Sequence, residues 1–151
     1  MSDTSIAVTR TLDATPDAIF DVLSNPERHH EIDGSGTVVS DDHTDRVQAV
    51  GDVFRMNMST EAMGDYQTDN HVIGFDQNKL IAWKTAPAGE EPPGWQWVWE
   101  LNATDSSTTE VTLTYDWSAM DPKLAQKLGM PVISHDDLEA SLKKLGATAG
   151  P

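Results

Sequence analysis

The chain has 151 residues, and its 25 acidic and 10 basic side chains give a formal net charge of −15. This charge speaks against nucleic acid and anionic membranes as partners, because the few Lys and Arg residues are scattered rather than clustered. The absence of cysteine excludes disulfides, thiol nucleophiles and zinc–thiolate sites. A chain of this length buries enough surface for one core, so we predict a single domain over residues 1–151, with an ordered core at about 5–146.

The N-terminal part predicts one strand followed by two short helices. Alternation of apolar and polar residues over Ser5–Leu12 is typical of a half-buried strand. Thr15-Pro16 and Asn25-Pro26 each combine an N-cap residue with a proline suited to the first helical position. The second helix is expected to run to about Ile32, where Gly34-Ser35-Gly36 ends it.

The middle of the chain predicts an antiparallel sheet. Short alternating segments are separated by turn residues, among them Asp76-Gln77-Asn78, and this spacing is typical of hairpins rather than of βαβ units. Residues 95–101 show the clearest pattern, with Trp95, Trp97 and Trp99 on one face. The six predicted strands are 37–42, 52–60, 66–75, 79–85, 95–103 and 109–117.

The C-terminal segment predicts the helix that covers the apolar face of this sheet. Ser134 and Asp137 have the spacing of a capping box, and Leu138, Leu142 and Leu145 form one helical stripe. We expect Gly146 to end this helix and residues 147–151 to be frayed. The preceding segment, 118–133, is interpreted as a short helix or a lid loop.

The order of these elements, and several residue patterns, resemble the START-like superfamily, often written SRPBCC, in its polyketide cyclase/dehydrase and lipid transport group. The patterns are "LDATPDAIFDVLSNPERHHEIDGSGTV" at 12–38, "IAW" at 81–83, "GWQWVWEL" at 94–101, "TEVTLTYDWS" at 109–118 and "LEASLKKL" at 138–145. The resemblance implies an α+β helix-grip fold. In this fold a curved antiparallel sheet of about seven strands wraps around a long C-terminal helix, and two short helices follow the first strand.

The resemblance also implies a deep cavity between the sheet and the C-terminal helix. We therefore expect the chain to bind a small, mostly apolar molecule, such as a lipid, a sterol or a polyketide. Tyr66, Tyr115 and Ser141 are the candidate polar anchors of this ligand. The candidate ligand-binding residues are Met56, Met58, Tyr66, Trp83, Trp97, Trp99, Tyr115, Leu138, Ser141 and Leu142.

Two other functions are compatible with the same sequence. One is an enzyme of the cyclase or dehydratase type, in which His71 or Tyr66 abstracts a proton from a polyketide-like substrate. His71 has Asp69 two residues away on the same strand face, the spacing of a carboxylate-oriented imidazole, but an exposed polar strand face is the favoured explanation of both. The other is a protein-interaction module that resembles the chaperone-activating members of the superfamily.

We predict no metal site and no cofactor. The segment His29-His30-Glu31 invites a metal interpretation, but neighbouring residues on a helix point about 100° apart, so a solvated helix end explains the histidines better. No apolar segment approaches the length of a membrane span, and the N-terminus does not resemble a secretory signal. We therefore expect a cytoplasmic protein without membrane insertion, either monomeric or homodimeric.

Overall fold

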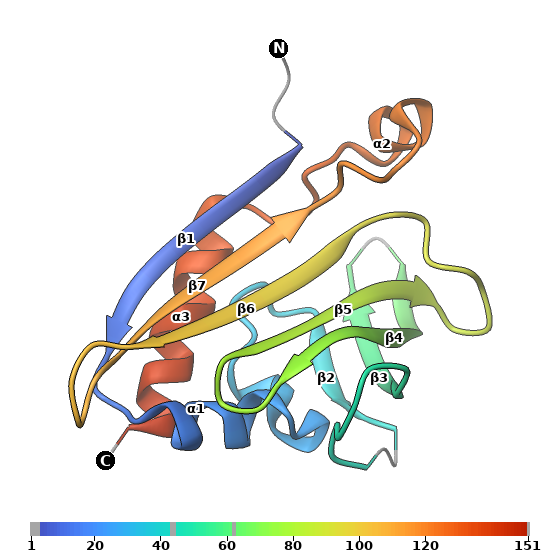
Figure 1. Cartoon of the computed structure of the whole chain (residues 1–151). Helices are drawn as coiled ribbons and strands as arrows, with labels where there is room; N and C mark the ends of the chain where they lie inside the picture. Colours follow the sequence, from blue (N-terminus) through green and yellow to red (C-terminus); the bar gives the residue numbers. More distant parts are fainter. Residues whose placement is uncertain (1–3, 43–44, 62, 151) are drawn as a thin grey trace.

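The computed structural model describes residues 4–42, 45–61 and 63–150, which form one curved antiparallel sheet and a set of helices (Figure 1). The seven strands follow the order β1-β7-β6-β5-β4-β3-β2. The strands are β1 (Ser5–Leu12), β2 (Val38–Asp41), β3 (Val53–Thr60), β4 (Gly64–Asp76), β5 (Leu80–Pro87), β6 (Gln96–Ala103) and β7 (Thr109–Asp116). The helices are α1 (Pro16–Leu23), η1 (Pro26–Glu31), α2 (Pro122–Leu128) and α3 (His135–Ala149). The predicted helix-grip fold is confirmed.

The two short helices begin where their capping residues predict. The Thr15 side chain accepts a hydrogen bond from the Ala18 backbone N–H, and the Asn25 side chain accepts one from Glu27. A proline follows each cap, where its missing N–H costs nothing. The second helix, η1, is a 3-10 helix of six residues, a form that is frequent in connecting segments but usually shorter than this one.

The long helix α3 begins as predicted but ends later. Ser134 and Asp137 form a reciprocal capping box, and the apolar stripe of Leu138, Leu142 and Leu145 is fully buried. The expectation that Gly146 ends the helix is wrong, because α3 continues to Ala149. Gly146 instead lies against Leu12 of β1, where a Cβ would come within 3.1 Å of a Leu12 methyl carbon. The residue is therefore small because the helix packs closely on the sheet.

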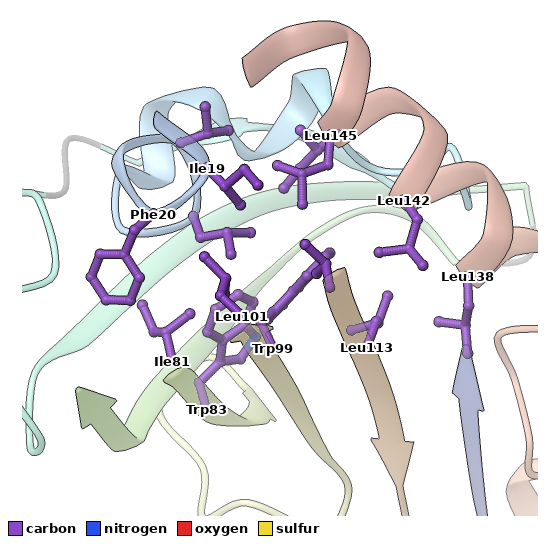
Figure 2. Packing of buried hydrophobic residues seen from close by; sticks show 14 of the residues in the cluster. Ile19, Phe20, Ile81, Trp83, Trp99, Leu101, Leu113, Leu138, Leu142 and Leu145 are labelled. Carbon is purple, nitrogen blue, oxygen red and sulfur yellow. The ribbon is translucent and has the colours of Figure 1, made fainter. Parts of the chain in front are cut away.

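The core lies between α3, α1 and one face of the sheet, which we call the inner face. Figure 2 shows the leucines of α3 and Ile19 and Phe20 of α1 directed toward side chains of the strands. The opposite, outer face carries the intervening polar residues of the same strands. This arrangement follows the predicted alternation, because successive side chains of a strand point to opposite faces.

A glycine-containing loop joins η1 to β2 and crosses α3 at close range. The backbone N–H of Gly34 donates a hydrogen bond to the Ser141 hydroxyl at 2.9 Å, and Lys144 Nζ donates to the Asp33 carbonyl at 2.9 Å. The Asp33 carboxylate accepts hydrogen bonds from Ser35, Thr37 and Val38. The loop therefore holds β2 and α3 together.

Among the helices of the described ranges, none is both long enough and apolar enough to span a membrane.

Candidate functional site

The structure places the ten candidate ligand-binding residues on the inner face or on α3, but it divides them by exposure. Three of them, Met58, Tyr66 and Trp97, are half-buried. The other seven are buried, namely Met56, Trp83, Trp99, Tyr115, Leu138, Ser141 and Leu142. The half-buried residues lie on β3, β4 and β6, and they are the candidates that a ligand from solvent can reach first.

The candidates on α3 have structural partners. Leu138 and Leu142 are 2% and 0% exposed and belong to the packed core. The Ser141 hydroxyl accepts the hydrogen bond from Gly34, so its principal partner is the crossing loop. These contacts are those expected of residues that fix the helix on the sheet.

Trp97 and Tyr115 form an aromatic stack on neighbouring strands. Their ring centroids are 4.3 Å apart and their planes differ by 11°, and the register pairs them directly across β6 and β7. Burial raises the pKa of Tyr115 to about 12. Its hydroxyl donates to the Met130 sulfur at 3.7 Å, so the segment between α2 and α3 lies over this stack.

Met58 and Tyr66 form a second half-buried pair, opposite each other on β3 and β4. Burial raises the pKa of the Tyr66 phenol, and the nearby Asp33 carboxylate raises it further. The crossing loop lies at this end of the sheet, because the Asp33 carboxylate accepts a hydrogen bond from the Val38 N–H and Val38 is paired with Met58. The pair is therefore a partly exposed apolar surface beside a carboxylate.

A buried polar trio lies on the inner face between these two aromatic groups, and the sequence analysis missed it. Asn70 Nδ2 donates to the Phe54 carbonyl at 3.2 Å and to the Thr68 hydroxyl at 3.4 Å, and Thr85 donates to Asn70 Oδ1 at 2.7 Å. All three polar residues are buried, with exposed fractions of 4% to 8%. Their position in the sequence could have revealed them, because Thr68, Asn70 and Thr85 each lie an even number of residues from a buried apolar residue of the same strand and therefore share its face.

His29 was also misjudged, since the sequence analysis assigned it to a solvated helix end. It is 7% exposed, its ring stacks on Trp83 at 5.3 Å, and it meets Phe54 edge to face. Its Nε2 lies 2.7 Å from the Leu23 carbonyl, so the neutral imidazole carries its proton on Nε2. Burial lowers the pKa of His29 to about 4.

The two candidate catalytic residues, His71 and Tyr66, are not brought together. They lie on opposite faces of β4, because five residues separate them and the pairing of β3 with β4 is regular between them. His71 lies on the outer face with Asp69, which forms a two-point ion pair with Arg55 at 2.7 and 3.1 Å. His71 Nε2 is shielded from solvent and has no hydrogen-bond partner among the described residues.

Neither of two open hollows on the surface of the described residues is the deep cavity expected between the sheet and α3. One, of about 590 Å³, is lined by Asp17, Ala18, Asp21, Ser24, Arg46, Gln77 and Asn78. The other, of about 430 Å³, is lined by Val39, Ser40, Asn57, Met58, Asp65, Tyr66 and Gln67. The second hollow therefore adjoins the Met58 and Tyr66 pair, although several of its lining residues belong to the outer face.

Within the described ranges, no group of three or more His, Asp or Glu side chains is arranged to hold a metal ion.

The sheet, its covering helix and the inner-face residues define a protein of the START-like or SRPBCC superfamily. A family model described as "Activator of Hsp90 ATPase homolog 1-like protein" matches residues 13–150. The chain belongs to this family. The match covers nearly the whole chain, which includes every inner-face residue discussed above.

Relatives and solved structures agree with this assignment. An uncharacterized protein of Mycobacterium tuberculosis strain H37Rv is 30% identical over 132 residues, which are 84% of this chain and 56% of that protein. The chain thus spans little more than half of that relative. The Zhui aromatase/cyclase from a Streptomyces species matches with a TM-score of 0.65 at 15% identity, covering 96% of this chain and 92% of that one. A major latex-like protein from Panax ginseng matches with a TM-score of 0.63 at 16% identity, covering 97% of each chain. At these identities the two structures show the fold alone.

Proposed function

We propose that this protein binds a small, mostly apolar ligand at the end of the inner face that α3 leaves partly open. The observation that carries the proposal is the half-buried state of Met58, Tyr66 and Trp97, while the neighbouring inner-face candidates are buried. Partly exposed aromatic and thioether side chains on a concave face are a typical wall of a ligand site. A cytoplasmic setting and a ligand of the lipid, sterol or polyketide kind belong to this proposal.

The polar trio supports the same site. Thr68, Asn70 and Thr85 supply hydrogen-bonding groups in surroundings that are otherwise apolar, close to the half-buried residues. A few fixed polar groups within an apolar wall orient the bound ligand and make the site specific for it. The ginseng and Streptomyces proteins share this fold, but the proposal rests on the residues of this chain.

The ligand proposal is tested with Trp97→Ala. The unmodified protein is titrated with long-chain alcohols, sterols, flavonoids and polyketide aromatics, while tryptophan emission and melting temperature are recorded. A ligand that binds the native state should quench the emission and raise the melting temperature. Trp97→Ala should then weaken binding at least about tenfold, because it removes one aromatic wall of the site.

Trp99→Phe is the matched control for this experiment. Trp99 lies on the same strand and the same face, but it is only 5% exposed, so the substitution should lower stability and leave affinity unchanged. Unchanged affinity in a folded Trp97→Ala protein would contradict the proposed wall. No response to any ligand class would contradict ligand binding itself.

Protein binding is the second candidate function, and the family description favours it, because that description names activation of the Hsp90 ATPase. The outer face offers exposed apolar residues, Val53 at 51% and Ile73 at 39%. Under this hypothesis, an excess of the protein should raise the ATPase rate of an Hsp90 several-fold. The double variant Val53→Ser, Ile73→Ser should lose this effect while it stays folded, and an unchanged rate with the unmodified protein would reject this candidate.

A further inference from the structure

The strands β2 and β1 form the two edges of the sheet, and only β2 has features that prevent pairing with another chain (Figure 1). β2 has four residues, its register with β3 shifts between Val38 and Ser40, and it ends at Asp41. Short, irregular and charged edge strands resist further pairing. β1 has eight residues in unbroken register with β7, contains no proline and no acidic residue, and carries one charge, Arg10. The edge of β1 is therefore unprotected.

The backbone groups at the free edge of β1 follow from its pairing with β7. The Trp117 N–H donates to the carbonyl of Thr4, its partner in the extended register, so these two residues form a hydrogen-bonded pair. Hydrogen-bonded and non-hydrogen-bonded pairs alternate along an antiparallel ladder, so the even-numbered residues of β1 bond to β7. Thr9 and Thr112 fit this assignment, because their hydroxyls lie 3.1 Å apart, as expected of the closer, non-hydrogen-bonded kind of pair. The N–H and C=O groups of the odd-numbered residues therefore point away from β7.

Four residues of β1 supply these outward groups, namely Ser5, Ala7, Thr9 and Thr11. All four are exposed and have small side chains. Among the described residues, none in a helix or loop makes a hydrogen bond to their backbone N–H or C=O groups. A row of free donors and acceptors on a regular strand is a template for one more strand.

We propose that two copies of this chain pair antiparallel through β1, so that their sheets become continuous across a two-fold axis at Val8. The outward groups determine the register, because odd-numbered residues must face odd-numbered residues in the new ladder. The register that uses all four of them pairs Ser5 with Thr11 of the second copy and Ala7 with its Thr9. A contact of this symmetry needs one surface that is complementary to itself.

The side chains of β1 meet this requirement. On the outer face, the pairs Ser5 with Thr11 and Ala7 with Thr9 bring only small side chains together. On the inner face, Arg10 lies opposite Ile6 of the second copy. The single charge of the strand thus never meets a like charge, whereas in-register parallel pairing would align Arg10 with itself.

Local charge also favours a second copy at this edge. The net charge of −15 makes two molecules repel each other wherever their carboxylates face. β1 has one positive and no negative side chain, so contact along it places no carboxylates of the two strands against each other. Met58 and Tyr66 lie on β3 and β4, at the other end of the strand order, so this proposal is independent of ligand binding.

The first test follows the whole protein by analytical ultracentrifugation from micromolar to millimolar concentration, together with amide hydrogen exchange measured by NMR. A dimer should form as the concentration rises. In the monomer, the amides of Ala7, Thr9 and Thr11 should exchange rapidly, because they face solvent, while that of Val8 exchanges slowly. As the dimer forms, the three fast amides should become protected.

Two double variants test the register. Ala7→Lys with Thr9→Lys places like charges opposite each other in both symmetric pairs, whereas Ala7→Glu with Thr9→Lys places opposite charges there. Both variants lose the Thr9 contact with Thr112, so they are matched in that respect. The dimer of the two-lysine variant should dissociate at least about tenfold more readily than that of the glutamate–lysine variant. Long-range charge cannot cause this difference, because two added lysines reduce the net negative charge.

Three results would overturn the inference. A protein that stays monomeric at every concentration would leave the edge of β1 to a strand of another protein. A dimer in which the amides of Ala7, Thr9 and Thr11 still exchange rapidly would use a different surface. Equal dissociation of the two double variants would reject the pairing of Ala7 with Thr9.

Discussion

Gly34→Ala is expected to destabilise the protein by at least about 3 kcal/mol. A Cβ at this position would clash with the Asp137 carbonyl oxygen, and it would lie 2.7 Å from the Ser141 nitrogen and 2.8 Å from the Ala140 Cβ. Two of these atoms belong to the backbone of α3, so they cannot move without disturbing the helix. The loop must move away instead, and the hydrogen bond from Gly34 to Ser141 is then lost.

Gly36→Ala is the control for Gly34→Ala. Gly36 lies in the same loop with a φ of +77°, and no atom lies within 4 Å of a Cβ built there. Its substitution costs only the left-handed backbone strain, about 1 kcal/mol. Thermal and urea unfolding of both variants measure the difference. If the two substitutions cost the same, the close approach of the loop to α3 is not what makes Gly34 necessary.

The second large effect is a loss of stability in mild acid that depends on His29. Its pKa is about 4 in the folded protein and about 6.5 when unfolded, so between these values the unfolded chain binds the additional proton. The stabilisation is complete above about pH 6.5 and is lost as the pH falls toward 4. The loss should reach about 2 kcal/mol at pH 5 and about 3 kcal/mol near pH 4.

His29→Gln isolates this contribution from the titration of the carboxylates. Glutamine can still donate to the Leu23 carbonyl, but it does not titrate. The free energy of unfolding, measured in urea from pH 7.5 to 5, should therefore fall more steeply for the unmodified protein than for this variant. His30→Gln replaces the exposed neighbour and should keep the steep dependence. Parallel curves for the unmodified protein and His29→Gln would show that His29 is not kept neutral by burial.

Much of the fold could be predicted because it depends on local patterns. The alternation in residues 95–101 identified β6 and its inner face, and Ser134 with Asp137 identified the start of α3. The end of α3 could not be predicted in this way. Gly146 has the chemistry of a helix stop, but the requirement it meets is the space beside Leu12, which is a tertiary contact.

Only part of the candidate site could be predicted from the sequence. Alternation placed Met58, Tyr66 and Trp97 on the inner face, but their exposure depends on where α3 and the crossing loop lie. Ser141 was expected to anchor a ligand, and only the structure shows that it receives the Gly34 N–H. The burial of His29 arises from its contacts with Phe54 and Trp83, which are distant in sequence.

The pairing of β1 with β7 determines when the sheet can be completed. Strand partners in this pair are widely separated along the chain, as for Thr9 and Thr112, whose hydroxyls are 3.1 Å apart across 103 residues. During folding, the entropy of closing so long a loop must be overcome before these hydrogen bonds form. The hairpins β3 to β7 need only local closure, so they can form first and present β7 as an open edge. Docking of β1 is then the step that closes this edge, and the rate of this step should limit how long the edge is exposed to aggregation.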